Sequence, residues 1–219
     1  MIPTRLLLIG SLALLATACT RETTIADHDG KALVEALRAA QSGSGPQRII
    51  LARRGSYVLS SASEVGLLLP SITGELTIEG NGAEIRSYAD GDVALLEVGR
   101  EGNVTLRDLA LAEGSDGAIR NFGTLRLVST RILDSTGNRS ASIVLNRGRL
   151  HMEDSIVAFN SLDGSERDSG TVQNYGELLL DNARVHDNFV AHGFNGVLNL
   201  GRGRTEGETA SMLVREAGR

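Results

Sequence analysis

One phrase of about 25 residues recurs along this chain of 219 residues, and a glycine marks the same point in each copy. The marked glycine precedes a short alternation of polar and apolar residues, as in GTLRL at Gly123 and GRLHM at Gly148. The aligned glycines are Gly74, Gly102, Gly123, Gly148, Gly176 and Gly201, with intervals of 28, 21, 25, 28 and 25 residues. A period of this length is typical of stacked structural units.

The alternation within each unit has the period of a β-strand. Leu125 and Leu127 flank Arg126, so the two leucines share one face and the arginine takes the other. Another apolar position follows nine residues after the glycine, in Ile132, Val157 and Val185. A third alternation precedes the glycine, in Ile119, Ile143, Leu145, Val172 and Val197. We therefore predict an all-β fold in which three short strands and polar turns form one triangular coil.

The composition favours thin stacked coils over a single globular core. Aromatic residues make up 3% of the chain, tryptophan is absent and there are 26 glycines. One coil alone buries too little apolar surface to offset the entropy of ordering its backbone. Stacking solves this problem because each strand then pairs with the strands above and below it. We expect a short, single-stranded parallel β-helix of about six coils.

An asparagine stands two residues before the aligned glycine in four successive units. These residues are Asn121, Asn146, Asn174 and Asn199. We predict that they form a structural ladder inside the coil, in which each carboxamide donates a hydrogen bond to the next. The alternative is that asparagine is present because it tolerates a left-handed turn backbone. Ser135, Asn160 and Asn188, each twelve residues after its glycine, are candidates for a second column.

The N-terminus has the pattern of a secretory signal peptide. Arg5 precedes the thirteen mostly apolar residues Leu6–Ala18, a run shorter than the about 20 residues that span a bilayer as a helix. Cys19 follows directly and is the only cysteine, and the junction resembles a bacterial lipobox, although Ala16 stands where such boxes prefer leucine. We predict lipidation of Cys19, which makes the membrane a partner through the N-terminal anchor. Ordinary cleavage after Ala18 is the alternative, and it would leave an unpaired thiol in an exported protein.

Three stretches, GAIRNFGTLRLVSTRILDS, GRLHMEDSIVAFNS and GTVQNYGELLLDNARVHDN, resemble the repeats of polymorphic outer-membrane proteins and related bacterial surface proteins. The resemblance runs from about Asp29 to Leu200 and implies a right-handed parallel β-helix. It implies little about activity, because the shared positions are structural. Thr20 stands where lipoproteins of the inner membrane carry Asp, so the lipobox resemblance implies an outer-membrane lipoprotein that faces the periplasm or the cell surface. A periplasmic or secreted protein is the alternative.

A helix is predicted before the first coil. Asp29 is a candidate N-cap, and Leu33, Val34 and Leu37 share one face of the following turns. Such a helix would cover the open end of the first coil. The expected organisation is a signal peptide at 1–18, a lipidated N-terminus and short tether at 19–28, a capping helix at 29–45, a parallel β-helix at 46–201 and a C-terminal cap or tail at 202–219.

Charge and motifs exclude several functions. The chain has 27 acidic and 22 basic residues, a net charge of −5, so nucleic acid is not an expected partner. Polysaccharide lyases and polygalacturonases of β-helical fold carry clustered Asp residues with an arginine base, or Asn-x-Asp, Asp-Asp and Gly-His-Gly. The nearest match here is Ala191-His192-Gly193, and His186, Asp187 and His192 fit no zinc signature. We assign no catalytic residue, metal ligand or cofactor, and we expect a monomer.

Outward polar residues are expected to be solvated. Asp154 aligns with Asn182 and Ser129, whereas Asp134 and Asp187 share a position that Phe159 occupies in the coil between them. We interpret these acids as surface turn residues. His151 is expected on a solvated strand face. Arg126 and Arg149 are expected at adjacent coil positions beside Glu177, in a column of ion pairs.

These observations favour a noncatalytic exported lipoprotein whose β-helix serves as a binding, adhesion or structural module. Its expected ligand is a polysaccharide or a surface protein lying along a flat strand face. The alternative is a polysaccharide-active lyase or glycoside hydrolase with an unfamiliar site. Carboxylates that converge with Arg and His in one groove would favour the enzyme, and a smooth face would favour the binding module.

Overall fold

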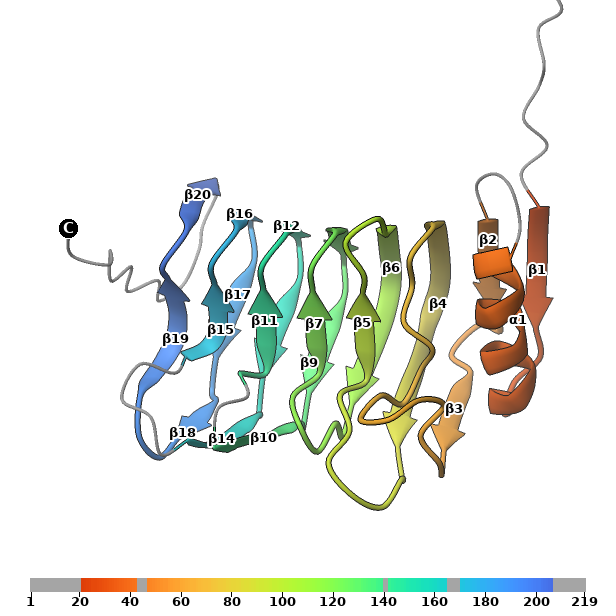
Figure 1. The fold of residues 1–219 in the computed structure, drawn as a ribbon, viewed down its shortest axis with the longest axis horizontal. Coiled ribbons are helices and arrows are strands. Elements are labelled where there is room, and N and C mark those ends of the chain that lie inside the picture. The colour runs from red at the N-terminus through yellow and green to blue at the C-terminus, as the bar shows by residue number, and fades with distance from the viewer. Residues whose placement is uncertain (1–20, 43–46, 140–141, 165–169, 207–219) are drawn as a thin grey trace, which may run out of the picture.

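The computed structural model describes residues 21–42, 47–139, 142–164 and 170–206. These residues form a parallel β-solenoid of about seven turns with one short helix near the N-terminal end (Figure 1). The all-β solenoid predicted from the repeat is confirmed. The winding begins earlier than the glycine period indicates, because strands stack on one another before Gly74, the first aligned glycine.

The longest sheet runs the length of the solenoid. Its parallel strands follow the order β1 (Arg21–Ile25), β2 (Gln47–Leu51), β4 (Glu75–Ser87), β6 (Asn103–Ala112), β8 (Thr124–Val128), β12 (Arg149–Glu153), β16 (Glu177–Asp181) and β20 (Arg202–Glu206). The same sheet bends around a corner into β3 (Ser56–Leu59), β9 (Arg131–Leu133), β13 (Ile156–Ala158) and β17 (Arg184–His186). Because the register is regular, one residue of each coil lies directly over its counterpart in the next.

Two smaller sheets close the coil. One contains β5 (Leu96–Val98), β7 (Ile119–Asn121), β11 (Val144–Asn146), β15 (Gly170–Asn174) and β19 (Phe194–Asn199), which lie side by side in Figure 1. The other contains β10 (Thr136–Arg139), β14 (Ser161–Gly164) and β18 (Phe189–Val190). The later coils therefore have a fourth strand that the three-strand prediction lacked. The sequence of β10, TGNR, has no apolar alternation that could have revealed it.

The core is a stack of aliphatic side chains inside the coils. Leu125 lies over Leu150 and Leu150 over Leu178, and each is at most 3% exposed. Leu127 and Met152 form a parallel row two residues further along the strands. Burial of each such side chain stabilises the fold by about 1.5–3 kcal/mol. The thin interior thus has no need of large aromatic rings.

The aligned glycines from Gly102 onward allow the coils to stack closely. A Cβ atom on Gly148 would lie 2.0 Å from the carbonyl oxygen of Gly123, and one on Gly176 would lie 2.0 Å from that of Gly148. Neither glycine has a positive φ. The requirement is therefore one of space between neighbouring backbones.

The helix α1 (Gly30–Ser42) packs on the first coils, as predicted. The backbone NH of Ala32 donates to Asp29 Oδ1 at 2.9 Å, so Asp29 caps the helix. Leu33 and Leu37 are buried in the core cluster. Figure 1 shows α1 beside β1 and β2 at the N-terminal end of the solenoid. No helix in the described part of the chain is both long and apolar enough to cross a membrane.

The ends of the solenoid extend beyond the boundaries expected from sequence. Residues 21–25 fall in the expected tether and form β1, which pairs with β2. Residues 202–206 fall in the expected tail and form β20, which pairs with β16. Cys19, with the rest of residues 1–20, and residues 43–46 and 207–219 lie outside the described residues.

Candidate functional site

The four asparagines of the predicted ladder lie in one buried column. Asn121 Nδ2 donates to Asn146 Oδ1 at 2.7 Å, Asn146 to Asn174 at 2.6 Å, and Asn174 to Asn199 at 2.6 Å. Each of the three donors also reaches a backbone carbonyl of the next coil, as in Asn146 Nδ2 to Glu177 O at 2.9 Å. All four side chains are enclosed, so this column holds coils together and is closed to ligands.

Two further polar columns line the other corners. Asn160 Nδ2 donates to Asn188 Oδ1 at 2.9 Å, and Asn160 Oδ1 accepts the backbone NH of Ser135 at 2.9 Å. The second of these columns was not predicted from the sequence. In it, the Thr130 backbone NH donates to Ser155 Oγ at 3.1 Å. Both residues stand seven positions after their glycines, so an alignment of all turn positions could have found them.

The outer face of the long sheet carries a surface hollow. It is a trough of about 610 Å³ over β6, β8, β12, β16 and β20. We name it the basic trough because its lining includes Arg126, Arg149, His151, Arg202 and Arg204. The lining also contains one carboxylate, that of Glu177. Outward positions of successive strands stack in register, so these side chains project from a single flat wall.

Two columns form the floor of the basic trough. In the first, Thr124, Arg149, Glu177 and Arg202 stack from β8 to β20. Arg149 Nε lies 2.9 Å from Glu177 Oε2, and Arg202 Nη1 lies 3.9 Å from Glu177 Oε1. The side chains of Arg149 and Arg202 remain 72% and 89% exposed, so both guanidinium groups keep donors for a further anion.

The second column corrects the expected position of Arg126. Its register partner is His151, and it pairs with Glu153, so it does not lie in one column with Arg149 and Glu177. Arg126 and Arg149 were expected at adjacent coil positions beside Glu177 in one column, but they stand three residues and one residue after their glycines. Outward positions recur every second residue along a strand, so this offset of two residues places Arg126 and Arg149 in neighbouring columns.

A row of carboxylates borders the basic trough on one side. Glu153, Asp181 and Glu206 stack in register on β12, β16 and β20. Arg126 pairs with Glu153 and Arg204 with Glu206 across this border. We call the three carboxylates the acidic rail. The face is therefore polarised, with guanidinium groups over its centre and carboxylates along one edge.

His151 lies on the outward face but is less solvated than expected. Its side chain is half-buried between the positions of Arg126 and Leu179. Its Nε2 atom is buried and has no hydrogen-bond partner in the described structure. The basic trough thus brings together a histidine, arginines and one carboxylate, Glu177.

The other predicted polar residues do not converge on this site. Ser129, Asp154 and Asn182 occupy one turn column with φ near 50°, and Asn182 Nδ2 donates to Asp154 Oδ1 at 2.5 Å. Asp187 lies beside His186, whose Nδ1 is 2.8 Å from Asp187 Oδ2. No group of three or more potential metal-ligating side chains occurs among the residues that the structure describes.

A corner next to the basic trough carries a second feature that the sequence analysis missed. The residue between Asn and Gly lies outside the coil in all four Asn-x-Gly phrases, and these residues stack as Phe122, Arg147, Tyr175 and Leu200. Arg147 Cζ lies 4.7 Å from the centroid of the Tyr175 ring. Arg100, Phe122 and Arg147 line a hollow of about 550 Å³. We call Arg100, Phe122, Arg147 and Tyr175 the corner ladder.

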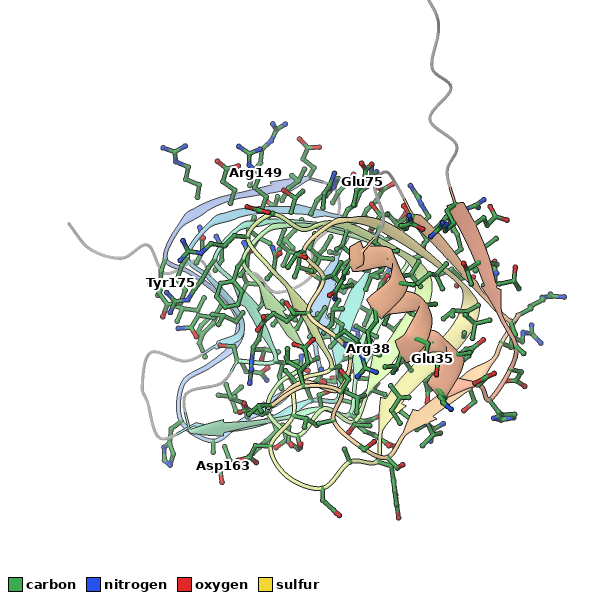
Figure 2. The ribbon with its side chains drawn as sticks, turned by 45° about the vertical axis from the view of Figure 1, so that its right-hand side comes forward. Glu35, Arg38, Glu75, Arg149, Asp163 and Tyr175 are labelled. Atoms are coloured by element: carbon green, nitrogen blue, oxygen red, sulfur yellow. The ribbon has the colours of Figure 1, made fainter. Side chains whose placement is uncertain are left out.

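The corner ladder and the basic trough occupy adjoining surfaces. Phe122, Arg147 and Tyr175 are each followed by the aligned glycine and then by a residue that lines the trough, as in Arg147-Gly148-Arg149, and Arg100 stands two residues before Gly102. Figure 2 shows Arg149 and Tyr175 extending outward from neighbouring sides of the solenoid. The Asn-x-Gly phrase was visible in the sequence, but its middle residue varies and gives no periodic signal.

Comparison with family models, with curated proteins and with solved structures finds no match for this chain.

Proposed function

We propose that this protein is a noncatalytic exported lipoprotein module that binds an extended, negatively charged polymer along the basic trough. The observation that carries the proposal is the alignment of Arg126, Arg149, Arg202 and Arg204 on one flat face of a chain whose net charge is −5. In an acidic protein, a face with this many guanidinium groups stands out as a site for anions.

The shape of the basic trough suits a polymer better than a small molecule. Five strands spaced by about 4.8 Å give it a length of about 19 Å. Its floor repeats in steps of one strand, so it offers similar contacts to successive units of an extended chain. Arginine is well suited to this task because its planar fork binds carboxylate, sulfate or phosphate groups through two parallel hydrogen bonds.

The acidic rail limits where a polyanion can lie on the sheet. Glu153, Asp181 and Glu206 repel a polyanion that strays toward that edge. Glu153 and Glu206 also hold Arg126 and Arg204 by ion pairs. The polymer is therefore directed along the column that contains Arg149 and Arg202.

Export and anchoring rest on the sequence alone. The apolar run before Cys19 and the lipobox-like junction support lipidation of Cys19 and attachment to the outer membrane. The resemblance to polymorphic outer-membrane protein repeats supports a role at the cell surface or in the periplasm. In this proposal the solenoid acts as a monomer that presents its long sheet to the polymer.

A polysaccharide-active enzyme is the second candidate, because Glu177, arginines and His151 lie in one trough. Most glycoside hydrolases need two carboxyl groups on either side of the scissile bond. The lining of the basic trough supplies one, and Arg149 and Arg202 hold it. Binding is therefore the better supported function.

The purified mature protein tests the two candidates directly. We expect it to retain fluorescently labelled polygalacturonate or another carboxylate polymer without shortening it, as measured by anisotropy and by size-exclusion chromatography. The double variant Arg149→Ala/Arg202→Ala should weaken binding about tenfold or more, because each lost charged hydrogen bond contributes about 1.5–3 kcal/mol. Arg184→Ala, which removes an exposed arginine from the neighbouring face, is the matched control. Depolymerisation would establish the enzyme and overturn the proposal.

A further inference from the structure

The corner ladder stacks in the same regular way as the strands that flank it. The backbone NH of Phe122 donates to Val98 O at 2.8 Å, that of Arg147 to Asn121 O at 2.8 Å, and that of Tyr175 to Asn146 O at 2.7 Å. The same turn is therefore repeated in the coils of these three residues, and Arg100 lies in the longer turn of the preceding coil. Successive ladder side chains are spaced by about 4.8 Å along the solenoid, in step with the trough residues beside them.

The corner ladder combines aromatic rings with arginines that have no carboxylate partner within the described ranges, and the basic trough lacks this combination. Tyr175 is 43% exposed and Phe122 is half-buried, in a chain that has only seven aromatic residues. Arg100 and Arg147 are exposed, and neither forms an ion pair with a carboxylate among the described residues. By contrast, Arg126, Arg149, Arg202 and Arg204 all have carboxylate partners.

Tyr175 is held in place from two directions. Arg147 covers its ring at 4.7 Å, and the Tyr175 hydroxyl accepts a hydrogen bond from Gln173 Nε2 at 2.8 Å. Gln173 is itself buried, and its Oε1 accepts a hydrogen bond from Ser142 Oγ at 2.6 Å. A surface ring that is fixed in this way loses little conformational entropy when a ligand stacks on it.

We propose that the corner ladder binds the sugar rings of an acidic polysaccharide, which identifies the polymer of the basic trough as a carbohydrate. This inference rests on the proposed function. Flat CH-rich faces of sugar rings pack on Phe122 and on the part of Tyr175 that Arg147 leaves exposed, while carboxylate or sulfate groups reach Arg100, Arg147 and, beyond the corner, Arg149. A polymer with charge but no rings would use the trough and leave the corner ladder unoccupied.

A comparison of polymers tests the ligand class. Polygalacturonate supplies rings and carboxylates, poly-L-glutamate supplies carboxylates without rings, dextran supplies rings without charge, and single-stranded DNA supplies phosphates and bases. We expect the mature protein to bind polygalacturonate at least about tenfold more tightly than the other three. Equal or tighter binding of poly-L-glutamate or of DNA would overturn the carbohydrate assignment.

Substitutions test the corner ladder itself. Tyr175→Ala is expected to weaken binding of polygalacturonate about tenfold and to leave binding of poly-L-glutamate unchanged, whereas Tyr175→Phe retains the ring and the affinity. Phe189→Ala removes an exposed ring from a different sheet and is the matched control. Thermal unfolding of each variant verifies the fold.

The outcomes separate this inference from the proposed function. If Tyr175→Ala and Phe122→Leu bind polygalacturonate as the unaltered protein does, while Arg149→Ala/Arg202→Ala fails to, the corner ladder is excluded and the basic trough stands. If no anionic polymer binds at all, the proposed function and this inference both fail.

Discussion

At the scale of single residues, two positions of each repeat hold neighbouring coils together. The asparagine supplies a chain of buried hydrogen bonds, and the glycine two residues later lets the backbones approach. Asn146 Oδ1 also accepts the backbone NH of Gly148 at 3.3 Å, so the two positions are linked within a coil. Their strict spacing in the sequence follows from this shared corner.

Removal of one ladder amide should destabilise the solenoid. Asn146→Ala leaves Asn121 Nδ2 and Asn174 Oδ1 without one partner each in an enclosed interior. We expect the free energy of unfolding to fall by about 2–4 kcal/mol, measured by urea denaturation. Asn103→Ala removes an exposed amide of β6 and should change it by at most about 0.5 kcal/mol. Equal losses in the two variants would contradict the role of the ladder.

A methyl group at the stacking glycine should be costly. In Gly148→Ala the new Cβ would lie 2.0 Å from Gly123 O, so the two coils must separate locally. We expect a loss of about 3 kcal/mol or more in thermal or chemical unfolding. Gly74→Ala is the matched control, because a Cβ there meets no atom within 4 Å and the backbone φ is not positive. A tolerated Gly148→Ala variant would show that the coils are more loosely stacked than described.

At the scale of elements, no strand is stable by itself. Most strands have three to five residues and gain their hydrogen bonds only from the coils above and below. At the N-terminal end, α1 and a buried tyrosine complete the first coils. Tyr57 donates from its hydroxyl to Ile25 O at 3.0 Å and accepts from the Ala52 backbone NH at 2.9 Å, which ties β1 to the turn before β3.

The pH dependence of stability should report on this tyrosine. Burial raises the pKa of Tyr57 above its ordinary value of 10.0, with the nearby carboxylates of Asp27 and Asp29 acting in the same direction and the hydrogen bond from Ala52 opposing them. The folded state disfavours the phenolate, so the contribution of Tyr57 is fully present below about pH 10 and is lost as the pH rises above it. Urea unfolding between about pH 8 and pH 11 should show this loss.

The variant Tyr57→Phe separates this effect from general alkaline denaturation. It should be less stable at neutral pH by about 1–3 kcal/mol, because Ala52 N and Ile25 O lose a buried partner. Its stability should then decline less steeply above about pH 10. An identical alkaline slope in both proteins would show that other groups cause it.

At the scale of the whole molecule, the solenoid converts sequence periodicity into charged rows on its surface. Residues about 25 positions apart become neighbours, so Arg149, Glu177 and Arg202 form a line that no local segment contains. Charges of both signs are sorted into a basic trough and an acidic rail. The net charge of −5 conceals this separation.

Binding to the basic trough should depend strongly on salt. Raising NaCl from about 0.05 M to about 0.5 M shortens the screening length and should weaken binding of polygalacturonate more than tenfold. The dependence should be shallower in Arg149→Ala/Arg202→Ala, because fewer charged contacts remain. Titrations by fluorescence anisotropy at several salt concentrations measure both slopes. Affinity that does not respond to salt would be inconsistent with an electrostatic trough.

Strand alternation at Leu125 and Leu127 and the cap at Asp29 were readable in the sequence, because both are local patterns. The fourth strand of the later coils was not, because β10 has the sequence TGNR, without apolar residues, and β14 has a single apolar residue, Leu162, which is too little for an alternation. The pairing of Arg126 with Glu153 was also missed. It depends on strand register, and register is decided when the coils stack.

The sequence by itself determined that the chain winds into repeated coils, because the coils supply inward aliphatic residues and an aligned glycine at regular intervals, and the later coils add a turn amide. Only the tertiary structure decided which outward residues meet. Outward side chains do not fill the core, so packing places few limits on their identity. Their grouping into the basic trough, the acidic rail and the corner ladder emerges when coils separated by about 25 residues lie one strand spacing apart.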